Sequence, residues 1–387
     1  MENKSFKIRG VNLGGWLMME GYILHGRNIA ESVFKKSFKK SNGLNALKDF
    51  EKSFRDTFIT EKDFKNIAVI GANTIRLPFN HKLIETKPYY FDKKGLNYLD
   101  NSFRWAEKYG LKIILDLHAA PGAQNCDWHG DCEGKAFFWE DKKCRQRAIV
   151  LWEFLADRYK NEKSLLGYDL LNEPVLNIKK EKILKTFYKD AIKKIKSVDK
   201  KNIIFLEGSV WAQKIDFLKD LIEENITISI HYYHPLSYTY NYNHFSSFPG
   251  KIDGESWDEK RIEKALKPYY EFSKENKVDI FVGEFGINWR GGYFGESEYL
   301  RSVLKVFEKY GFGHAYWTYK AVSNNTFPDG IYQHLPNNNF VKREGPVYGW
   351  ENYIPSWKSN KKNIVNLWDT KNYTQNKEIT NALRKYC

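Results

Sequence analysis

The sequence lacks the features of several large classes of protein. No run of eighteen apolar residues occurs, and the N-terminal stretch MENKSFKIRG has no apolar core of a secretory signal. There is no zinc-finger spacing, no tail rich in arginine and glycine, and no low-complexity linker. We therefore expect a soluble protein with no membrane and no nucleic-acid partner, either cytoplasmic or secreted with its signal peptide removed. Its oligomeric state stays open.

Basic charge and aromatic residues are, by contrast, abundant. The net charge is +14 over 387 residues, but the lysines are interleaved with Glu and Asp in short groups, a pattern typical of a solvated surface. Hydrophobic residues make up 42% and aromatic residues 16% of the chain, enough for a large core without disulfides. A chain of this length is either two ordinary domains or one elaborated α/β barrel.

Short β-type runs alternate with amphipathic segments along the chain, a pattern that predicts a parallel sheet with helices on the outside. An open sheet would give similar alternation, but polar residues follow most of the strands, which favours a closed (β/α)8 barrel. We expect helices at 61–70, 94–109, 143–159, 180–197, 215–224, 257–275 and 296–310. The expected strands are Lys7–Leu13, Thr74–Pro78, Lys112–His118, Gly167–Leu171, Asn202–Leu206, Thr227–Tyr232, Ile280–Phe285 and His314–Thr318.

Two long insertions and a C-terminal extension interrupt this alternation. Gly21–Phe58 follows the first strand and Ala119–Asp141 follows the third, and loops this long are usually functional or carry structure of their own. Residues 321–387 follow the last strand and should pack on the barrel. With no internal repeat and no second set of elements, we predict a single catalytic domain over residues 1–387.

Two carboxylates follow strands of the predicted barrel. Glu173 lies in Leu171-Asn172-Glu173-Pro174 and Glu284 in Gly283-Glu284-Phe285-Gly286. Cleavage of a glycosidic bond needs such a pair, one group to protonate the leaving oxygen and one to attack the anomeric carbon or activate water. Either string alone is weak evidence, since Asn-Glu-Pro also marks an ordinary helix start.

Other strand ends strengthen the case for an active site. Each carries a residue able to bind or orient a polar ligand, and chance does not explain so many of them at strand ends. These residues are Arg76, His118, His231, Tyr233 and Trp317. A histidine at one strand end is usually structural, but these residues end successive strands, where barrel enzymes assemble their sites.

From Arg9 to about Lys320 the chain resembles glycoside hydrolase family 5. The strings that carry the likeness are RGVNLGGW at 9–16, the Arg76 and His118 strands, LNEP at 171–174, HYY at 231–233, GEFG at 283–286 and YW at 316–317. The resemblance implies a retaining (β/α)8 enzyme without cofactor or metal, acting on an oligosaccharide or polysaccharide. It implies that Glu173 is the acid/base and Glu284 the nucleophile.

The chemistry of this pair is consistent with those roles. Arg76 and Tyr233 would keep Glu284 ionised, whereas Glu284 would raise the pKa of Glu173 by like-charge repulsion. Asn172 would bind the sugar 2-hydroxyl, which requires a local bend because neighbouring residues of a strand point to opposite faces. His118 and His231 would fix hydroxyls or carboxylates, and Trp317 would form the floor under the sugar.

Two segments suggest the mode of action. Glu20 matches a carboxylate that exo-acting fungal β-1,3-glucanases of the family use to hold the terminal sugar. The loop at 120–131 resembles β-mannosidase and β-glucosidase members, which makes Gln124, Trp128 and His129 candidates for the sugar pocket. We expect exo action on β-linked gluco- or manno-oligosaccharides; the alternative is an endo-β-glucanase with an open cleft.

The remaining alternatives involve metals or loss of activity. Cys126, His129, Cys132 and Cys144 permit a structural zinc site or, in an exported protein, a Cys126–Cys132 disulfide, but free thiols fit better. A metal-dependent hydrolase using His118, His231 and His234 would need a His-x-His on the first strand, which is absent. An inactive sugar-binding barrel would not need both carboxylates together with Arg76.

Overall fold

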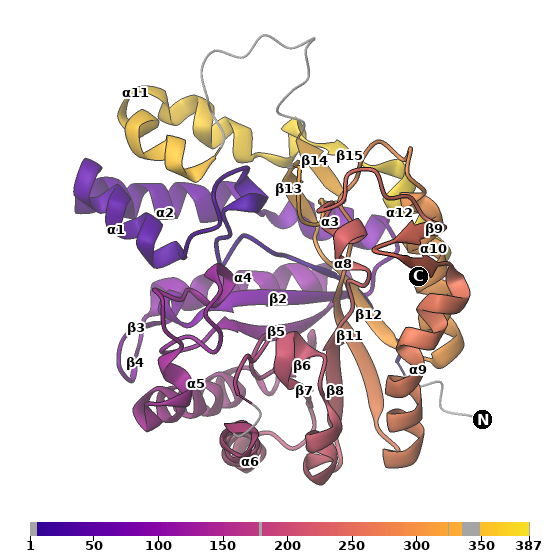
Figure 1. Ribbon diagram of the computed structural model, residues 1–387. Helices are drawn as coiled ribbons and strands as arrows, with labels where there is room; N and C mark the ends of the chain where they lie inside the picture. Colours follow the sequence, from indigo (N-terminus) through magenta and orange to yellow (C-terminus); the bar gives the residue numbers. More distant parts are fainter. Residues whose placement is uncertain (1–5, 178–179, 324, 335–348, 387) are drawn as a thin grey trace.

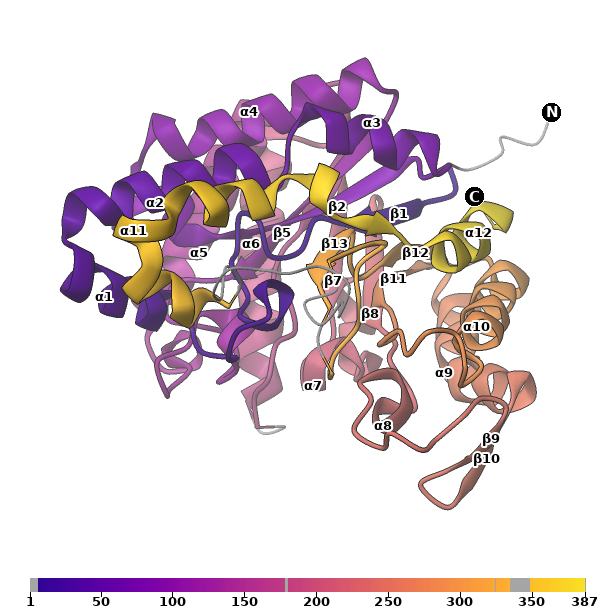
Figure 2. The ribbon, with the colours of Figure 1, turned by 90° about the horizontal axis from the view of Figure 1, so that it is seen from above.

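The computed structural model describes residues 6–177, 180–323, 325–334 and 349–386. Its centre is a closed barrel of parallel strands with helices around the outside (Figures 1 and 2). Residues 335–348 of the expected C-terminal extension lie outside the described residues. In the part of the chain that the structure describes, no helix is both long and apolar enough to cross a membrane.

The barrel is a (β/α)8 barrel, as the sequence predicts. Its strands follow the order β1-β12-β11-β8-β7-β6-β5-β2, so each lies beside its neighbours in the chain, and every pair is parallel. All the predicted barrel strands are present, with ends shifted by a residue or two. They are β1 (Arg9–Asn12), β2 (Thr74–Asn80), β5 (Lys112–Ala119), β6 (Leu165–Asp169), β7 (Ile203–Glu207), β8 (Ile226–His231), β11 (Asp279–Phe285) and β12 (Gly313–Tyr316).

Helices cover the outside of this barrel, and their first turns are capped by short polar side chains. Asp92, Asp141 and Asp258 each accept a hydrogen bond from a backbone N–H of the helix that follows. The barrel helices are α3 (Glu61–Val69), α4 (Lys93–Lys108), α5 (Lys142–Tyr159), α6 (Glu181–Val198), α9 (Glu259–Asn276) and α10 (Glu296–Tyr310).

The segment between β7 and β8 differs from the expected helix at 215–224. It contains the short turn α7 (Ser209–Ala212) and then a 3-10 helix, η6 (Asp216–Leu221). Leu218 and Leu221 are its buried residues, and a spacing of three places both on one face of a 3-10 helix. The apolar spacing was therefore real, but the prediction of an α-helix there was wrong.

The insertion after β1 forms a helical hairpin, α1 (Glu31–Asn42) and α2 (Leu44–Phe58), which turns at Gly43 with φ +90°. Helix α11 (Trp350–Trp368) lies beside this hairpin (Figure 2). The contact is aromatic: Phe34 stacks on Trp350, and Phe50 meets Trp357 and Trp368. The first and last parts of the chain thus share one apolar layer.

Smaller elements complete the structure. The C-terminal part also forms a small sheet and a helix that lies against α10: β13 (Lys320–Val322), β14 (Tyr332–His334), β15 (Thr374–Gln375) and α12 (Lys377–Lys385). Two hairpins and a short helix lie in the loops, namely β3 (Glu85–Lys87) with β4 (Tyr90–Phe91), β9 (Gly250–Ile252) with β10 (Glu255–Trp257), and α8 (Leu236–Thr239). The single-turn helices are η1 (Tyr22–Leu24), η2 (His81–Leu83), η3 (Trp128–Gly130), η4 (Phe137–Trp139) and η7 (Thr370–Asn372).

The inside of the barrel changes character along its axis. One buried cluster near the N-terminal ends of the strands is apolar and consists of Ile8, Ile114, Phe205, Phe281 and Ala315. Above it the interior is charged, because Arg76, Asp116 and Asp169 are all fully buried. The polar groups therefore face the carboxyl ends of the strands, where a barrel presents its site.

Candidate active site

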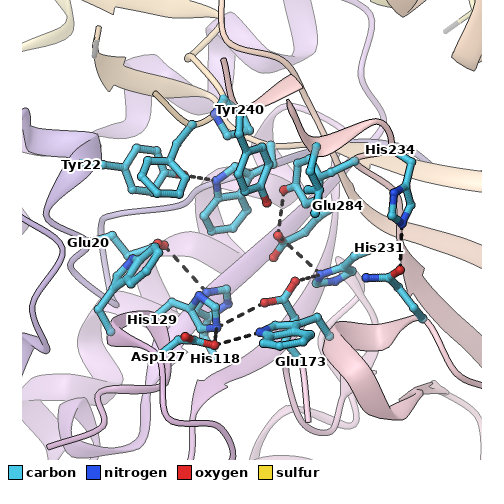
Figure 3. Close-up of a pocket in the computed structure, with 18 of the residues that line it drawn as sticks. Glu20, Tyr22, His118, Asp127, His129, Glu173, His231, His234, Tyr240 and Glu284 are labelled. Atoms are coloured by element: carbon cyan, nitrogen blue, oxygen red, sulfur yellow. Dashed lines mark hydrogen bonds and ion pairs between the residues drawn. The ribbon is translucent and has the colours of Figure 1, made fainter. Parts of the chain in front are cut away.

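A cavity of about 240 Å³ opens at the carboxyl ends of the strands (Figure 3). Its walls come from the ends of β1, β5, β6, β7, β8, β11 and β12 and from the loops that follow them. Most of the predicted site residues line it: Glu20, His118, Trp128, His129, Glu173, His231, Tyr233, Glu284 and Trp317. Three do not, namely Arg76, Gln124 and Asn172.

Glu284 stands at the end of β11, where the strand pairing shifts by one residue between Val282 and Glu284. Such a bulge re-aims the side chain that follows it. Gly283 is needed there, since a Cβ would come within 2.8 Å of Ser229 Oγ. The Glu284 carboxylate accepts hydrogen bonds from Arg76 Nη1 at 2.7 Å and from the Tyr233 hydroxyl at 2.9 Å. Each of its oxygens therefore has a donor.

Arg76 lies beneath the cavity and does not reach it. Besides Glu284 its guanidinium donates to Asp169 at 2.8 Å and Glu207 at 2.9 Å, and it lies 3.1 Å from Asp116. Burial alone would lower the pKa of Arg76, but these four carboxylates raise it well above its usual value. The predicted substrate contact of Arg76 is thus corrected: its donors are used on carboxylates and on the amide oxygens of Asn12 and Asn172, and it fixes Glu284 from below.

The backbone bends at Glu173, as the sequence requires. Glu173 has φ +47°, in the left-handed region that non-glycine residues seldom adopt. Its backbone N–H donates to Glu207 Oε2 at 2.6 Å, which holds the bend. Asn172 accepts from Arg76 Nη2 at 2.9 Å, and its Nδ2 has no hydrogen-bond partner among the described residues. A buried donor without a partner is suited to a ligand oxygen.

Two histidines flank the Glu173 carboxylate, one on each oxygen (Figure 3). His231 Nδ1 lies 2.7 Å from Oε1, and His129 Nε2 lies 3.2 Å from Oε2. His231 also contacts Glu207 at 3.2 Å and Glu284 at 3.5 Å, so it links the two strand-end carboxylates. One oxygen of Glu173 comes within 4.8 Å of one oxygen of Glu284.

The charges around Glu173 act against the expected rise of its pKa. Burial raises the pKa, but the hydrogen bond from His231 and the charges of His129 and His231 outweigh it, and the pKa falls to about 2. For His231, burial lowers the pKa, but Glu207, Glu284 and Glu173 raise it well above its usual value. Charged histidines would thus shift the pKa of Glu173 in the direction opposite to the rise expected from repulsion by Glu284.

His118 and Trp317 form one side of the cavity. Their rings stack with centroids 5.4 Å apart and planes 8° from parallel. Burial lowers the pKa of His118 to about 3, so its ring is neutral, and its Nδ1 lies 2.7 Å from Asp116 Oδ2. The Trp317 indole donates to the Tyr22 hydroxyl. The flat face and the fixed ring suit an apolar sugar face with hydroxyls at its edge.

Glu20 lies near His118, with Oε1 3.8 Å from His118 Nε2. Burial, followed by repulsion from Glu284 and Glu173, raises the pKa of Glu20 well above its usual value. The side chain is 3% exposed, and Oε1 makes no hydrogen bond with any described residue. Glu20 therefore presents to the cavity a buried carboxyl oxygen without a partner in the described structure, which is suited to a ligand hydroxyl.

The loop after β5 contributes its predicted residues in different ways. Trp128 lines the cavity, and His129 turns toward Glu173. Gln124 is fully buried: its Nε2 donates to the carbonyls of His118 and Asn172, and its Oε1 accepts from Ala120 N. The predicted substrate contact of Gln124 is corrected, because its whole amide is used to hold the loop against two strands.

An aromatic wall at one side of the cavity was not expected from the sequence, although one of its members, Trp128, was a predicted pocket residue. Phe327, in the segment after β13, has its ring 5.0 Å from Tyr22, 5.4 Å from Trp128 and 5.3 Å from Tyr240. We call these four residues the Phe327 wall. It joins three loops that are far apart in the chain. No short motif marks Phe327, since it lies beyond the barrel strands.

Two further residues were missed. Glu207 ends β7 and contacts Arg76, His231 and the backbone of Glu173; its place at a strand end was a usable signal. Trp211 lines the cavity, is 40% exposed and donates from its indole to Asp127 at 2.8 Å. This contact bridges the loops after β5 and β7.

The cavity also contains side chains of metal-ligating type. Glu173, His231 and Glu284 offer ligand atoms within 4.8 Å of one another. However, Arg76 already neutralises Glu284, and His231 is hydrogen-bonded to Glu173, so this set is suited to proton transfer more than to a cation. Among the described residues, Cys126, Cys132 and Cys144 are free thiols and do not join His129 in a ligand group. His234 faces Gln213 instead of joining His118 and His231.

The barrel and its paired carboxylates define a glycosidase. The family model described as cellulase, glycosyl hydrolase family 5, matches residues 35–323. The chain belongs to glycoside hydrolase family 5, and it hydrolyses O-glycosyl bonds of β-glycosides.

Relatives within the family differ in the activity that their names give. Endoglucanase C of Acetivibrio thermocellus is 27% identical over 351 residues, which cover 82% of this chain and 92% of the relative. A glucan 1,3-beta-glucosidase of Lachancea kluyveri is 32% identical over 197 residues, 47% of this chain and 44% of the relative. In fold, endoglucanase Cel5A of Thermotoga maritima superposes with a TM-score of 0.64 at 22% identity, covering 97% of this chain and 96% of that one.

Proposed function

We propose that this enzyme cleaves its substrate by double displacement, with Glu284 as nucleophile and Glu173 as acid/base. The observation that carries the proposal is the separation of the two carboxylates, whose nearest oxygens come within 4.8 Å. Retaining glycosidases hold this pair about 5 Å apart, whereas inverting enzymes need roughly 6.5–9.5 Å to admit a water molecule. The short separation therefore supports retention.

The first step follows from the contacts of the two groups. A carboxylate oxygen of Glu284 attacks the anomeric carbon while the bond from that carbon to the leaving oxygen breaks. The electron pair of that bond goes to the leaving oxygen, which takes a proton from Glu173. Arg76 and Tyr233 keep their hydrogen bonds to Glu284 and orient it for the attack. The result is a glycosyl-enzyme ester and a released alcohol.

The second step reverses the first with water in place of the alcohol. Glu173 takes a proton from the water, whose oxygen bonds to the anomeric carbon, and the ester bond to Glu284 breaks. Glu173 regains its proton and Glu284 its charge. Asn172 Nδ2, which has no other partner, is placed to donate to a hydroxyl beside the reacting carbon in both steps.

We further propose that the substrate enters end-on and loses one terminal gluco- or manno-configured residue at a time. The Phe327 wall supports this, because it joins the loops after β1, β5 and β8 by direct ring contacts and so obstructs one side of the cavity. The cavity of about 240 Å³ is smaller than the roughly 300–1,000 Å³ of ordinary ligand pockets, so it suits a short ligand. Glu20, His118 and Trp317 would bind the terminal sugar.

An endo-acting β-glucanase is the second candidate. It is favoured by the similarity to Endoglucanase C, which covers most of both chains, whereas the similarity to the glucan 1,3-beta-glucosidase covers less than half of each. An endo enzyme needs an open cleft on both sides of the bond that is cleaved. The two candidates therefore differ in whether the Phe327 wall blocks a substrate chain.

The test uses hexasaccharides of β-1,3-glucan, β-1,4-glucan and β-1,4-mannan labelled at the reducing end. Exo action predicts unlabelled monosaccharide and labelled pentasaccharide as the first products. Early labelled di- and trisaccharides would instead establish the endo enzyme. NMR of the first product in the same reaction should show the β-anomer, and an initial α-anomer would overturn the retaining mechanism.

A further inference from the structure

His129 occupies an unusual position for a residue outside the catalytic pair. It lies on the loop after β5, and its Nε2 contacts Glu173 Oε2 at 3.2 Å and Asn125 Nδ2 at 3.0 Å. Its side chain is 14% exposed, whereas that of His231 on the other oxygen is 1% exposed. One ring nitrogen of His129 thus faces an amide and the proposed acid at once.

The orientation of the Asn125 amide is fixed by two other contacts. Asn125 Oδ1 accepts from the backbone N–H of Asp127 at 3.1 Å, and Nδ2 donates to the backbone carbonyl of Glu173 at 3.0 Å. A flipped amide would place oxygen against oxygen and nitrogen against nitrogen at both points. Asn125 is fully buried, so no water replaces these partners. Its second amide hydrogen therefore points at His129 Nε2.

A ring nitrogen that receives a hydrogen bond carries no hydrogen itself. His129 Nε2 is then an acceptor, and the ring is neutral with its hydrogen on Nδ1. The contact of Nε2 with Glu173 Oε2 becomes a hydrogen bond only if the proton is on the carboxyl group. We infer that His129, with its tautomer set by Asn125, is a positioning residue that holds the acid proton on Oε2 of Glu173. This inference rests on the acid/base role proposed for Glu173.

The arrangement reconciles the acid role with the charges nearby. A neutral Glu173 can accept from His231 at Oε1 and donate from Oε2 to the lone pair of His129 Nε2, which it shares with Asn125 Nδ2. When Glu173 loses its proton, Oε2 faces the lone pair of Nε2, which disfavours the anion. The other ionisable groups that face this pair are Glu20, Asp116, His118, Asp127, Glu207, Tyr233, Tyr240 and Glu284.

The opposite assignment, in which His129 is a cation, makes the opposite prediction. An imidazolium at Oε2 would stabilise the carboxylate and lower the pKa of Glu173, as in the fully charged state described above. Removal of a neutral acceptor should lower the pKa of Glu173, whereas removal of a cation should raise it. The sign of the change therefore decides between the two assignments.

The first measurement needs no substrate. Enzyme labelled with 13C at the glutamate δ-carboxyl is titrated by NMR, and the Glu173 signal is identified by its loss in Glu173→Gln. We expect the pKa of Glu173 to be about one pH unit lower in His129→Leu than in the wild type, a change equal to one ordinary hydrogen bond. His129→Gln should restore most of the shift, because its carbonyl can accept where Nε2 did. A Glu173 signal that is ionised from pH 4 upward, or one whose pKa rises in His129→Leu, would overturn the inference.

Kinetics separate this result from a failure of the proposed function. For phenyl β-glycosides, whose leaving group needs the acid, the alkaline limb of kcat/KM should move to lower pH in His129→Leu by the same amount as in the NMR titration. For 2,4-dinitrophenyl β-glycosides, which leave without a proton, the limb should not move. Equal shifts for both substrates would mean that His129 affects the fold of the site and not the acid proton. If azide fails to rescue Glu173→Ala on the dinitrophenyl substrate, the acid/base role is wrong, whatever the NMR shows.

Discussion

Around Arg76 the mouth of the barrel is filled with charge, whereas around Phe327 it is filled with aromatic rings. Arg76 is fully buried and contacts four carboxylates at 2.7–3.1 Å. The Phe327 wall has ring contacts at 5.0–5.4 Å and no ion pair among its four residues in the described structure. Both regions border the same cavity and approach it from different sides.

This difference indicates which part of the site tolerates amino-acid substitutions. A buried ion pair depends on every partner, because removal of one leaves an uncompensated charge in a medium of low dielectric. Aromatic packing depends mainly on shape and buried area, and a smaller ring or a missing ring leaves space without leaving a charge. We expect loss of the Arg76 cation, which all four carboxylates share, to affect folding strongly, and substitutions at the Phe327 wall to affect which substrate enters.

The largest effect is expected for Glu284→Gln, which removes the proposed nucleophile but keeps its size. Turnover should fall by about 10⁴-fold or more, because no other group can form the glycosyl-enzyme ester. The free energy of unfolding should change little, since the amide oxygen can still accept from Arg76 at 2.7 Å. Steady-state rates on aryl β-glycosides and urea unfolding measure the two quantities. Near-normal turnover would refute the nucleophile assignment.

Arg76→Met tests the charged region as a structural unit. It leaves Asp116, Asp169, Glu207 and Glu284 without their shared cation, so the free energy of unfolding should fall by about 3–5 kcal/mol at pH 7. Without the cation the folded-state pKa values of these carboxyls rise above their unfolded values. The folded protein then binds more protons, so the deficit relative to wild type should shrink as the pH falls from 7 to 5.

Urea unfolding at both pH values measures this deficit, and Arg76→Lys is the matched control. A lysine keeps the charge but has a single nitrogen where Arg76 uses Nε, Nη1 and Nη2, so its deficit should be intermediate. A deficit in Arg76→Met that grows toward pH 5 would contradict the assigned cause.

The charged region was largely predictable from the sequence, because its residues stand at strand ends. Once alternation gives the strands, Arg76, His118, Glu173, His231 and Glu284 must meet at one end of a closed barrel. The sequence could not show which of them reach the cavity. Arg76 and Gln124 are both buried beneath it, and side-chain direction at these positions depends on contacts made by other strands.

The aromatic region was not predictable, because its residues lie in loops and not at strand ends. Phe327, Tyr22 and Tyr240 come from three loops with no shared motif, and only the folded chain brings their rings within 5.3 Å of Phe327. The contacts that control the proton of Glu173 could not be anticipated from Glu284 alone. The two histidines that control it lie 44 residues before it and 58 after it, and their approach to opposite oxygens is a property of the assembled barrel.

Glu20 sharpens the contrast, because its burial raises the pKa of its carboxyl group. Glu20→Ala should lower kcat/KM on short β-oligosaccharides by roughly 5- to 150-fold, equal to about 1–3 kcal/mol for an unpaired buried hydroxyl. Glu20→Gln is the matched control: if Glu20 is neutral at pH 7, the amide should replace it with only a small loss. A loss in Glu20→Gln as large as in Glu20→Ala would mean that the ionised form is needed. The rates are compared at pH 7 on one substrate.

Phe327→Ala should have the smallest effect on rate and the clearest effect on products. The truncation removes three ring contacts, each of which contributes ~0.5–1.5 kcal/mol. Because neighbouring rings can partly fill the space, we expect kcat/KM on a disaccharide to fall by about tenfold. If the Phe327 wall is what stops a chain, the variant should also release more labelled di- and trisaccharide from a reducing-end-labelled hexasaccharide than the wild type does. Phe245→Ala is the control, because Phe245 is 92% exposed and lies outside the residues that line the cavity. Unchanged products in Phe327→Ala, with the same tenfold loss, would mean that the ring supports Tyr22 and Trp128 without blocking the path of the chain.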